Sequence, residues 1–251
     1  MSGHSKWAGI KHKKAVVDAK RGQAFTRASR EITIAAREGG GNTDGNFRLR
    51  LAVQKAREIN MPTDRIKAAI QRGTGELAGE RLEEVRYEGY GPSGVAVMVD
   101  TLTDNRNRTS AAIRHLFSKG GGNLGETNSV GWMFERKGAM AVNAGGKDPE
   151  DVGLAAIEAG ADDVQVDGKS VEITTSPSAF EKVKAAIEAL GVTVENAEIT
   201  MQPKQTVAVG EDKAAAVLRL VESLEEDDDV QQVYANFDIP NDVLERVAAQ
   251  V

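Results

Sequence analysis

The sequence predicts an α+β protein with several domains, in which an N-terminal helical bundle is followed by two α/β domains, one inserted in the other. Three observations predict this fold. The first seventy-odd residues have a helical period, and residues 138–202 follow the order β-α-β-β-α-β, which is a ferredoxin-like pattern. The piece after residue 202 is too small to form a domain. The predicted domains are 1–76 (helical), 80–137 plus 203–240 (α/β), 138–202 (the insertion) and 241–251 (a C-terminal helix).

Charge divides the chain into a basic and an acidic part. Residues 1–72 contain sixteen lysines and arginines against six acids, a formal charge of +10. The remaining residues contain 16 bases against 32 acids, a formal charge of −16. A segregated positive field is typical of proteins that bind a polyanion such as nucleic acid. The basic part is therefore the predicted nucleic-acid-binding domain.

The basic part contains three predicted helices. Their residue ranges are 18–38, 46–59 and 62–73. On the first, Phe25 and Ile32 share the apolar face, and the opposite face carries Arg27, Arg30 and Arg37, which we expect to point outward. Pro62 suits the first turn of the third helix, and Gly73 is expected to end that helix.

Residues 3–14, GHSKWAGIKHKK, have no period of helix or strand. Two interpretations stay open for them. They form either a solvated tail pinned by Trp7 or a flexible basic arm that becomes ordered on a phosphate backbone. His4 and His12 have no cysteine or further histidine nearby, so no metal site is expected.

The predicted nucleic-acid contacts are the basic side chains of this arm and of the first two helices. They are Lys6, Lys11, His12, Lys13, Lys14, Lys20, Arg21, Arg27, Arg30, Arg37, Arg48, Arg50, Lys55 and Arg57. A possible second contact region consists of Arg106, Arg108 and Arg114, whose alternative role is ordinary solvated surface.

The α/β part contains two patterns that resemble catalytic or cofactor motifs. Gly89, Gly91 and Gly94 satisfy G-x-G-x-x-G, but a strand follows them instead of a helix, which predicts a hairpin turn. Asp104 or Asn105 is expected to cap the next helix, and the sequence places no substrate pocket around Asp104. The acidic run 225–229 is interpreted as a solvated connection, or alternatively as a segment that repels phosphate.

The composition excludes several classes of function. The chain has no cysteine, which removes disulfides and thiolate metal sites, and no apolar run approaches the ~20 residues of a membrane span. The N-terminal residues lack the apolar region of a secretory signal. We expect a soluble, cytoplasmic protein that is not an enzyme, with no catalytic residue, cofactor, metal or small-molecule substrate.

Two long stretches carry a resemblance to a known family. They are residues 3–75, from GHSKWAGIKHKK to IQRGTG, and residues 87–138, from YEGYGPSGVAVMVD to GWMFERKG. Both resemble the YebC/PmpR family, which includes mitochondrial translational activators of cytochrome oxidase subunit one. Asn128 departs from the pattern, since a glycine is expected there. The resemblance implies an all-helical N-terminal domain and two α/β domains, in proteins usually labelled DNA-binding transcriptional regulators. Some members instead look like ribosome-associated factors that assist translation, including at proline-rich stalls.

Two binding hypotheses follow. The basic domain binds ribosomal RNA as part of a translation factor, or it binds duplex DNA as part of a transcriptional regulator. Trp7, Phe25 and Phe47 are the only aromatic residues in the first 73, and no recognition-helix pattern is evident. Contact with the phosphate backbone is therefore favoured over reading of bases, which leans towards RNA. A third hypothesis is an adaptor whose α/β domains bind other proteins.

Overall fold

The computed structural model describes residues 18–79 and 81–248. It is a mixed α/β fold with antiparallel sheets, as the sequence predicts at that level. The chain forms two compact units. One contains residues 133–204, and the other contains the residues before and after them.

The helical segment of the larger unit consists of α2 (Asp18–Gly39), α3 (Phe47–Glu58) and α4 (Thr63–Thr74). Its core is built from small and branched side chains, with Ile32 and Ala36 of α2 against Leu49 and Ala56 of α3 and Ala69 of α4. Asn46 caps α3 by accepting a hydrogen bond from the Leu49 backbone N–H at 3.0 Å. Such small side chains let the three helix backbones approach one another closely.

The third helix ends later than its sequence predicts. Gly75, not Gly73, takes the left-handed conformation at the C-cap, with φ of 83°. Gly73 lies inside α4, where a Cβ atom would be 2.4 Å from the Thr33 carbonyl oxygen of α2. This glycine is therefore required by the close approach of two helices and not by the end of one.

The first sheet of the larger unit has the order β3-β1-β2-β9 and is antiparallel throughout. Its strands are β1 (Glu83–Tyr90), β2 (Ala96–Thr103), β3 (Asn123–Leu124) and β9 (Val230–Ala235). A short 3-10 turn, η1 (Pro92–Gly94), joins β1 to β2, so the glycine motif forms a hairpin turn as predicted. The distant strand β9 pairs with β2, which ties the end of the chain into the sheet that begins at residue 83.

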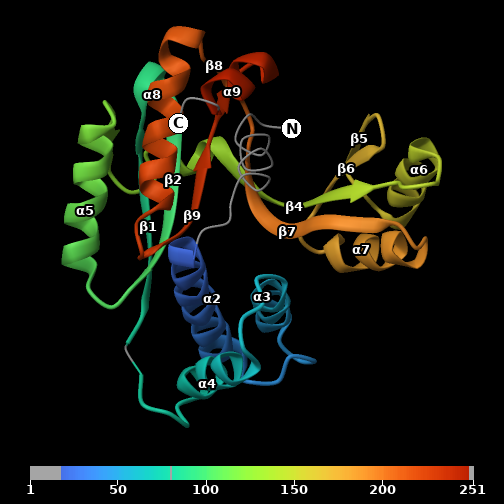
Figure 1. Ribbon diagram of the computed structural model, residues 1–251, viewed down its shortest axis with the longest axis horizontal. Coiled ribbons are helices and arrows are strands. Elements are labelled where there is room, and N and C mark those ends of the chain that lie inside the picture. Colours follow the sequence, from blue (N-terminus) through green and yellow to red (C-terminus); the bar gives the residue numbers. More distant parts are fainter. Residues whose placement is uncertain (1–17, 80, 249–251) are drawn as a thin grey trace. The chain divides into compact units, whose positions relative to one another are not determined.

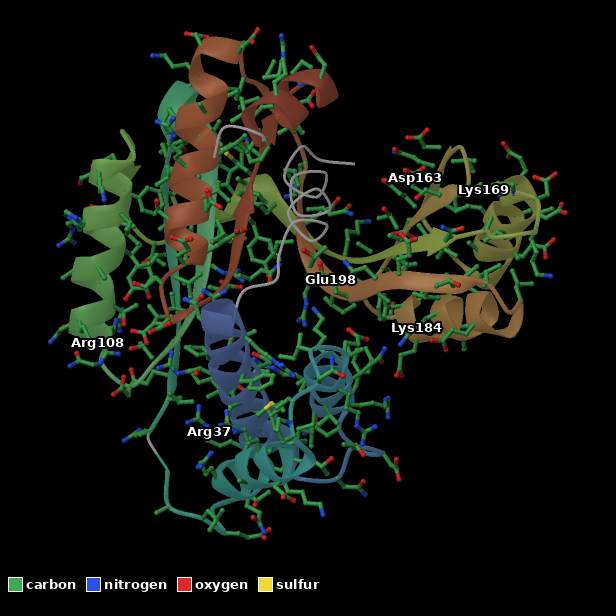
Figure 2. The ribbon with its side chains drawn as sticks, viewed as in Figure 1. Arg37, Arg108, Asp163, Lys169, Lys184 and Glu198 are labelled. Carbon is green, nitrogen blue, oxygen red and sulfur yellow. The ribbon has the colours of Figure 1, made fainter. Side chains whose placement is uncertain are left out.

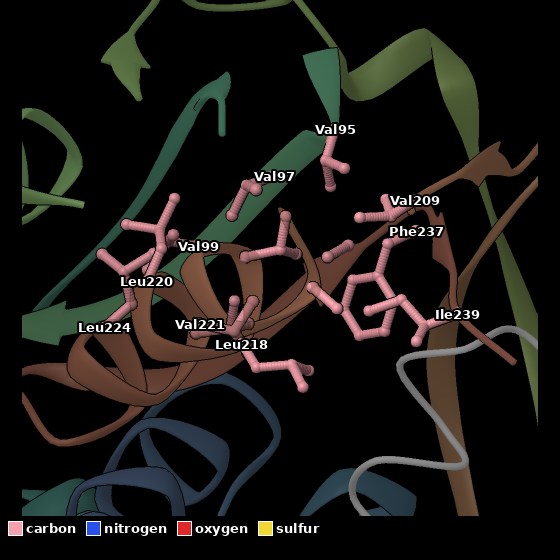
Figure 3. Packing of buried hydrophobic residues seen from close by; sticks show 14 of the residues in the cluster. Val95, Val97, Val99, Val209, Leu218, Leu220, Val221, Leu224, Phe237 and Ile239 are labelled. Atoms are coloured by element: carbon pink, nitrogen blue, oxygen red, sulfur yellow. The ribbon is translucent and has the colours of Figure 1, made fainter. Parts of the chain in front are cut away.

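Two helices, α5 (Arg106–Lys119) and α8 (Glu211–Glu225), cover one face of this sheet (Figure 1). The core beneath them contains Val95, just before β2, and the alternate residues Val97 and Val99 of β2. They share one cluster with Leu218 and Val221 of α8 (Figure 3). Asn105 caps α5 by accepting from the Arg108 backbone N–H at 3.1 Å, which confirms one of the two predicted caps.

The C-terminal elements join the same core. They are β8 (Val207–Ala208), β10 (Phe237–Asp238) and α9 (Asn241–Ala248), with β8 and β10 paired in parallel. Phe237 and Ile239 are buried there together with Val243 and Leu244 of α9. The C-terminal helix is thus fastened to the α/β core by an apolar face.

The unit of residues 133–204 has the element order β-α-β-β-α-β. Its elements are β4 (Phe134–Asn143), α6 (Pro149–Ala159), β5 (Asp163–Asp167), β6 (Ser170–Thr175), α7 (Phe180–Ala189) and β7 (Thr193–Pro203). Its antiparallel sheet has the order β5-β6-β4-β7, with the first and third strands side by side in the centre. Asp148 caps α6, accepting from the Glu150 backbone N–H at 3.0 Å.

Two local details concern turns. Residues 131–133 form a 3-10 turn, η2 (Gly131–Met133), where the Glu88 carboxylate accepts the Val130 and Gly131 backbone N–H groups at 2.8 and 2.6 Å. Asn128 has φ of 66°, a conformation that asparagine tolerates, so the turn that a glycine would make is retained.

Candidate nucleic-acid interface

The arginine face of α2 is occupied by the acidic run 225–229, so our expectation that these arginines point outward is wrong for Arg27 and Arg30. Arg27 donates hydrogen bonds to the Glu225 and Asp227 carbonyl oxygens, the second at 3.1 Å. Arg30 Nη1 donates to the Asp228 carbonyl at 2.6 Å and forms an ion pair with Asp229 Oδ1 at 2.9 Å. Burial lowers the pKa of Arg27 in spite of the acids around it.

The same face of α2 carries a buried apolar residue and a third arginine, which donates a hydrogen bond to the backbone. Ile34 is fully buried and packs against Leu82 and Leu102. Arg37, which is labelled in Figure 2, donates to the Leu82 carbonyl at 2.8 Å although its side chain is exposed. The opposite face of α2 forms the helical core, so α2 is contacted on two sides.

Asp229 is the centre of a buried polar cluster, and the interpretation of its segment as solvated is wrong at this residue. Only 5% of it is exposed. Besides Arg30 it receives hydrogen bonds from Arg108 Nη2 at 2.9 Å and Thr109 Oγ1 at 2.6 Å. Burial alone would raise the pKa of Asp229, but the hydrogen bonds from Thr109 and Arg108 and the charge of Arg30 hold it below its usual range.

In the predicted second contact region, one arginine has acidic partners within the protein and the other two are exposed. Arg108, labelled in Figure 2, is bound by Asp229 and by Asp104, the latter at 2.7 Å. Arg106 and Arg114 are exposed on α5. Asp100 is held by Arg86 through two hydrogen bonds of 2.6 and 2.8 Å, so Asp100 and Asp104 belong to separate ion pairs.

Two arginines of α3 also have partners within the helical segment or beside it. Arg48 contacts three carboxylates, those of Glu31 at 2.8 Å, Glu38 at 2.6 Å and Glu84. Burial alone would lower its pKa, but the Glu31 and Glu84 carboxylates raise it. Arg50 donates to the Thr43 carbonyl at 3.1 Å and lies over the Phe47 ring. These guanidinium groups stabilise the bundle.

The remaining bases of the segment are exposed. Of the predicted contacts these are Arg21, Lys55 and Arg57. Sequence reasoning omitted from the site three further exposed bases, all on α4: Arg65, Lys67 and Arg72. Arg65 and Arg72 are seven residues apart, the spacing of Arg30 and Arg37, so this signal was present in the sequence. The arm residues Lys6, Lys11, His12, Lys13 and Lys14, and the Lys20 side chain, lie outside the described part of the chain.

Other chemistries have little support in the part of the chain that the structure describes. There, no three histidine, aspartate or glutamate side chains are grouped so that they could hold a metal ion. Among the described helices, none combines the length and the hydropathy needed to span a membrane.

Comparison with known proteins assigns both parts of the chain to one family. Residues 5–76 match the model of the "TACO1/YebC protein N-terminal domain", and residues 82–237 match that of the "TACO1/YebC second and third domain". These two matches correspond to the helical segment and to the sheet-containing parts.

Full-length relatives are similar over almost the whole chain. A protein of Natranaerobius thermophilus is 54% identical over 98% of this chain and 99% of its own length. One of Dictyoglomus turgidum is 52% identical over 99% and 100%. Both are named "Probable transcriptional regulatory protein", which is the name of a regulator and not of an enzyme. The crystal structure of a conserved hypothetical protein from Aquifex aeolicus is 50% identical and superposes with a TM-score of 0.81 over 90% of this chain and 93% of that one.

Proposed function

The chain belongs to the TACO1/YebC family, and from this premise we propose that it is a non-enzymatic regulator of gene expression that binds nucleic acid through its helical segment. One observation carries the proposal. Within a segment of formal charge +10, the bases Arg57, Lys55, Arg65 and Arg72 of α3 and α4 are exposed. Their long-range attraction to phosphate would supply most of the binding free energy.

We propose that the contact surface contains two groups of bases. The first is the arm of Lys6, Lys11, His12, Lys13 and Lys14, continued by Lys20 and Arg21 at the start of α2. The second is the exposed set Lys55, Arg57, Arg65 and Arg72. The internally bonded Arg27, Arg30, Arg37, Arg48 and Arg50 are assigned a supporting role, because a guanidinium that already serves carbonyl and carboxylate oxygens would have to break those bonds to reach a phosphate.

We further propose that the nucleic acid is RNA and that the protein assists translation on the ribosome, possible targets including proline-rich stalls. The support is chemical. The segment offers phosphate-binding groups, but its first two described helices present no row of asparagine, glutamine and arginine that would read base edges in a major groove. Backbone and shape recognition suits structured RNA.

The alternative is a DNA-binding transcriptional regulator, and the names of the curated relatives favour it. A regulator of that kind needs specific binding about 10³-fold or more above its non-specific binding. We therefore expect the two functions to differ in sequence discrimination. A translation factor should vary by less than about tenfold among duplex DNAs of different sequence.

For the domain arrangement we propose an N-terminal binding domain, an α/β domain that carries it, and a ferredoxin-like domain inserted in that α/β domain. The acidic character of residues 133–204, with seven bases and thirteen acids, supports a role for the inserted domain away from phosphate. It would contact proteins or solvent instead.

Crosslinking of the full-length protein in cells, followed by sequencing of the bound nucleic acid, tests the proposal. Ribosomal RNA as the dominant product, with salt-sensitive co-sedimentation with ribosomes, would support translation. Enrichment of a defined promoter DNA, without ribosome association, would establish the transcriptional alternative. A protein that crosslinks to neither would contradict both and leave the adaptor hypothesis.

A further inference from the structure

A groove of about 780 Å³ lies between α2 and α4, which are neighbours in Figure 1. Gly79 and Leu82, from the chain that follows α4, form part of its wall. Its volume is within the range of roughly 300–1,000 Å³ that is usual for sites of small organic ligands. Of the predicted contact residues that the structure describes, only Arg30 lines it.

The groove combines an apolar wall with guanidinium groups. Phe25, Met61 and Leu82 supply apolar surface, and Arg65 and Arg72 of α4 are exposed at its edge. Residues seven apart on a helix project from the same side, so both arginines can reach one ligand. Arg30, the third arginine of the lining, is held by Asp229 and is fixed in place.

The Phe25 ring is covered by guanidinium groups, so a base would use it by taking the place of Arg65 while that guanidinium turns to the phosphate. The guanidinium carbon of Arg65 lies 5.7 Å from the centre of this ring, and that of Arg21 lies 5.6 Å from it. Arginine planes and aromatic rings are the groups on which proteins stack unpaired bases. Asp64, also in the lining, would accept a hydrogen bond from a base amino group.

We propose that this groove binds one unpaired nucleotide of a single strand, with its phosphate on Arg65 and Arg72 and its base against Phe25. The proposal rests on the function proposed above, and it identifies the subsite and the form of nucleic acid. A base inside a regular duplex is paired and stacked on its neighbours, so it could not enter the groove. The occupant is therefore an unpaired loop or end.

The α4 helix provides a matched control for the test. Lys67 is exposed on the same helix but does not line the groove. Arg65→Ala, Arg72→Ala and Lys67→Ala each remove one positive charge, so they change the long-range field equally. Affinity of the full-length protein for a labelled ten-nucleotide single-stranded RNA should fall about tenfold or more in each arginine variant, since a charge-assisted bond to phosphate is lost. In Lys67→Ala it should fall less than about threefold. Equal losses of RNA affinity in all three variants would contradict binding in the groove.

An abasic strand and a Phe25 variant test whether the base contributes to binding. An abasic strand of the same length keeps every phosphate, so the wild type should bind it about fivefold or more weakly than the normal strand. Phe25→Leu, which keeps an apolar side chain, should reduce that difference to less than twofold. Equal affinity of the wild type for both strands would overturn the base-binding part.

Competition experiments with AMP and UMP test whether the groove binds a nucleotide within a strand or a free mononucleotide. A mononucleotide that competes at micromolar concentration would overturn the assignment to a strand, whereas only weak competition is expected. The failure of this proposal differs from failure of the proposed function. If the groove variants bind RNA as the wild type does, only the groove is wrong. If the wild type binds neither RNA nor DNA, both proposals are wrong.

Discussion

α2 and α4 carry arginines at the same spacing but use them in opposite ways. Arg30 and Arg37 of α2 donate to oxygens of Asp228, Asp229 and Leu82, whereas Arg65 of α4 lies over the Phe25 ring and Arg72 is exposed. The side of α2 that carries arginines is covered by the acidic run and by Leu82, whereas Arg65 and Arg72 line a groove in which Arg30 is already bonded to the acidic run. Spacing on a helix therefore tells which arginines lie together, but it does not tell what they contact.

The largest expected effect on stability comes from removing the acidic partner of the α2 arginines. Asp229→Ala removes a buried carboxylate that accepts from Arg30, Arg108 and Thr109 at once. These groups keep only their second acceptors, and the partly buried positive charge loses its closest counter-charge. We expect a loss of about 3 kcal/mol in the free energy of unfolding, measured by urea denaturation of the full chain.

Asp228→Ala is its control, since it removes the adjacent but exposed acid. It should cost less than about 1 kcal/mol, and Arg65→Ala should change stability by no more than about 0.5 kcal/mol. If Asp229→Ala were as mild as Asp228→Ala, the buried cluster would not hold α2 to the α/β core.

The next effect tests whether shape, not charge, holds α4 against α2. Gly73→Ala should cost about 2 kcal/mol, because its Cβ atom would be 2.4 Å from the Thr33 carbonyl oxygen. Gly22→Ala in α2 is the control, because no atom lies within 4 Å of the added Cβ. It should instead stabilise α2 by roughly 0.5–1 kcal/mol. Thermal melting followed by circular dichroism measures both, and equal melting temperatures would contradict the close helix contact.

A smaller effect sharpens the contrast between bonded and exposed arginines. Arg57→Ala should lower nucleic-acid affinity severalfold and reduce the slope of log K against log salt by about 1, with stability unchanged. Arg37→Ala should lose about 1 kcal/mol of stability, because its bond to the Leu82 carbonyl is removed, and should leave the slope unchanged. The wild-type slope is expected at about −4 to −7. A loss of slope in Arg37→Ala alone would reverse the assignment of roles.

The smallest effect is a dependence on pH. The pKa of Asp229 is lowered by folding, so the ionised group stabilises the folded state above the unfolded pKa of about 3.9, and this contribution is lost as pH falls through the folded value. The difference in melting temperature between the wild type and Asp229→Asn should therefore be largest near pH 7 and shrink by pH 3. A difference that stays constant over this range would remove Asp229 from the acid transition.

Local sequence was sufficient for most of the secondary structure and for the family. The periods of 18–38 and 46–59 predict α2 and α3 almost to the residue, and Asn105 is a cap as expected. These features depend on contacts within a few residues, which a sequence displays directly. The charge division between residues 1–72 and the rest is a property of composition and is equally visible there.

Only the tertiary structure decided which charges are exposed. Arg30 and Asp229 are 199 positions apart, and no local pattern reveals that a run of five acids would supply the partners of α2. The same applies to Gly73, whose position near the end of a helix predicts a C-cap but whose neighbour across α2 requires a glycine inside the helix. A helical period fixes the side on which a residue lies, while the free energy of each charged group depends on what the rest of the chain places opposite that side.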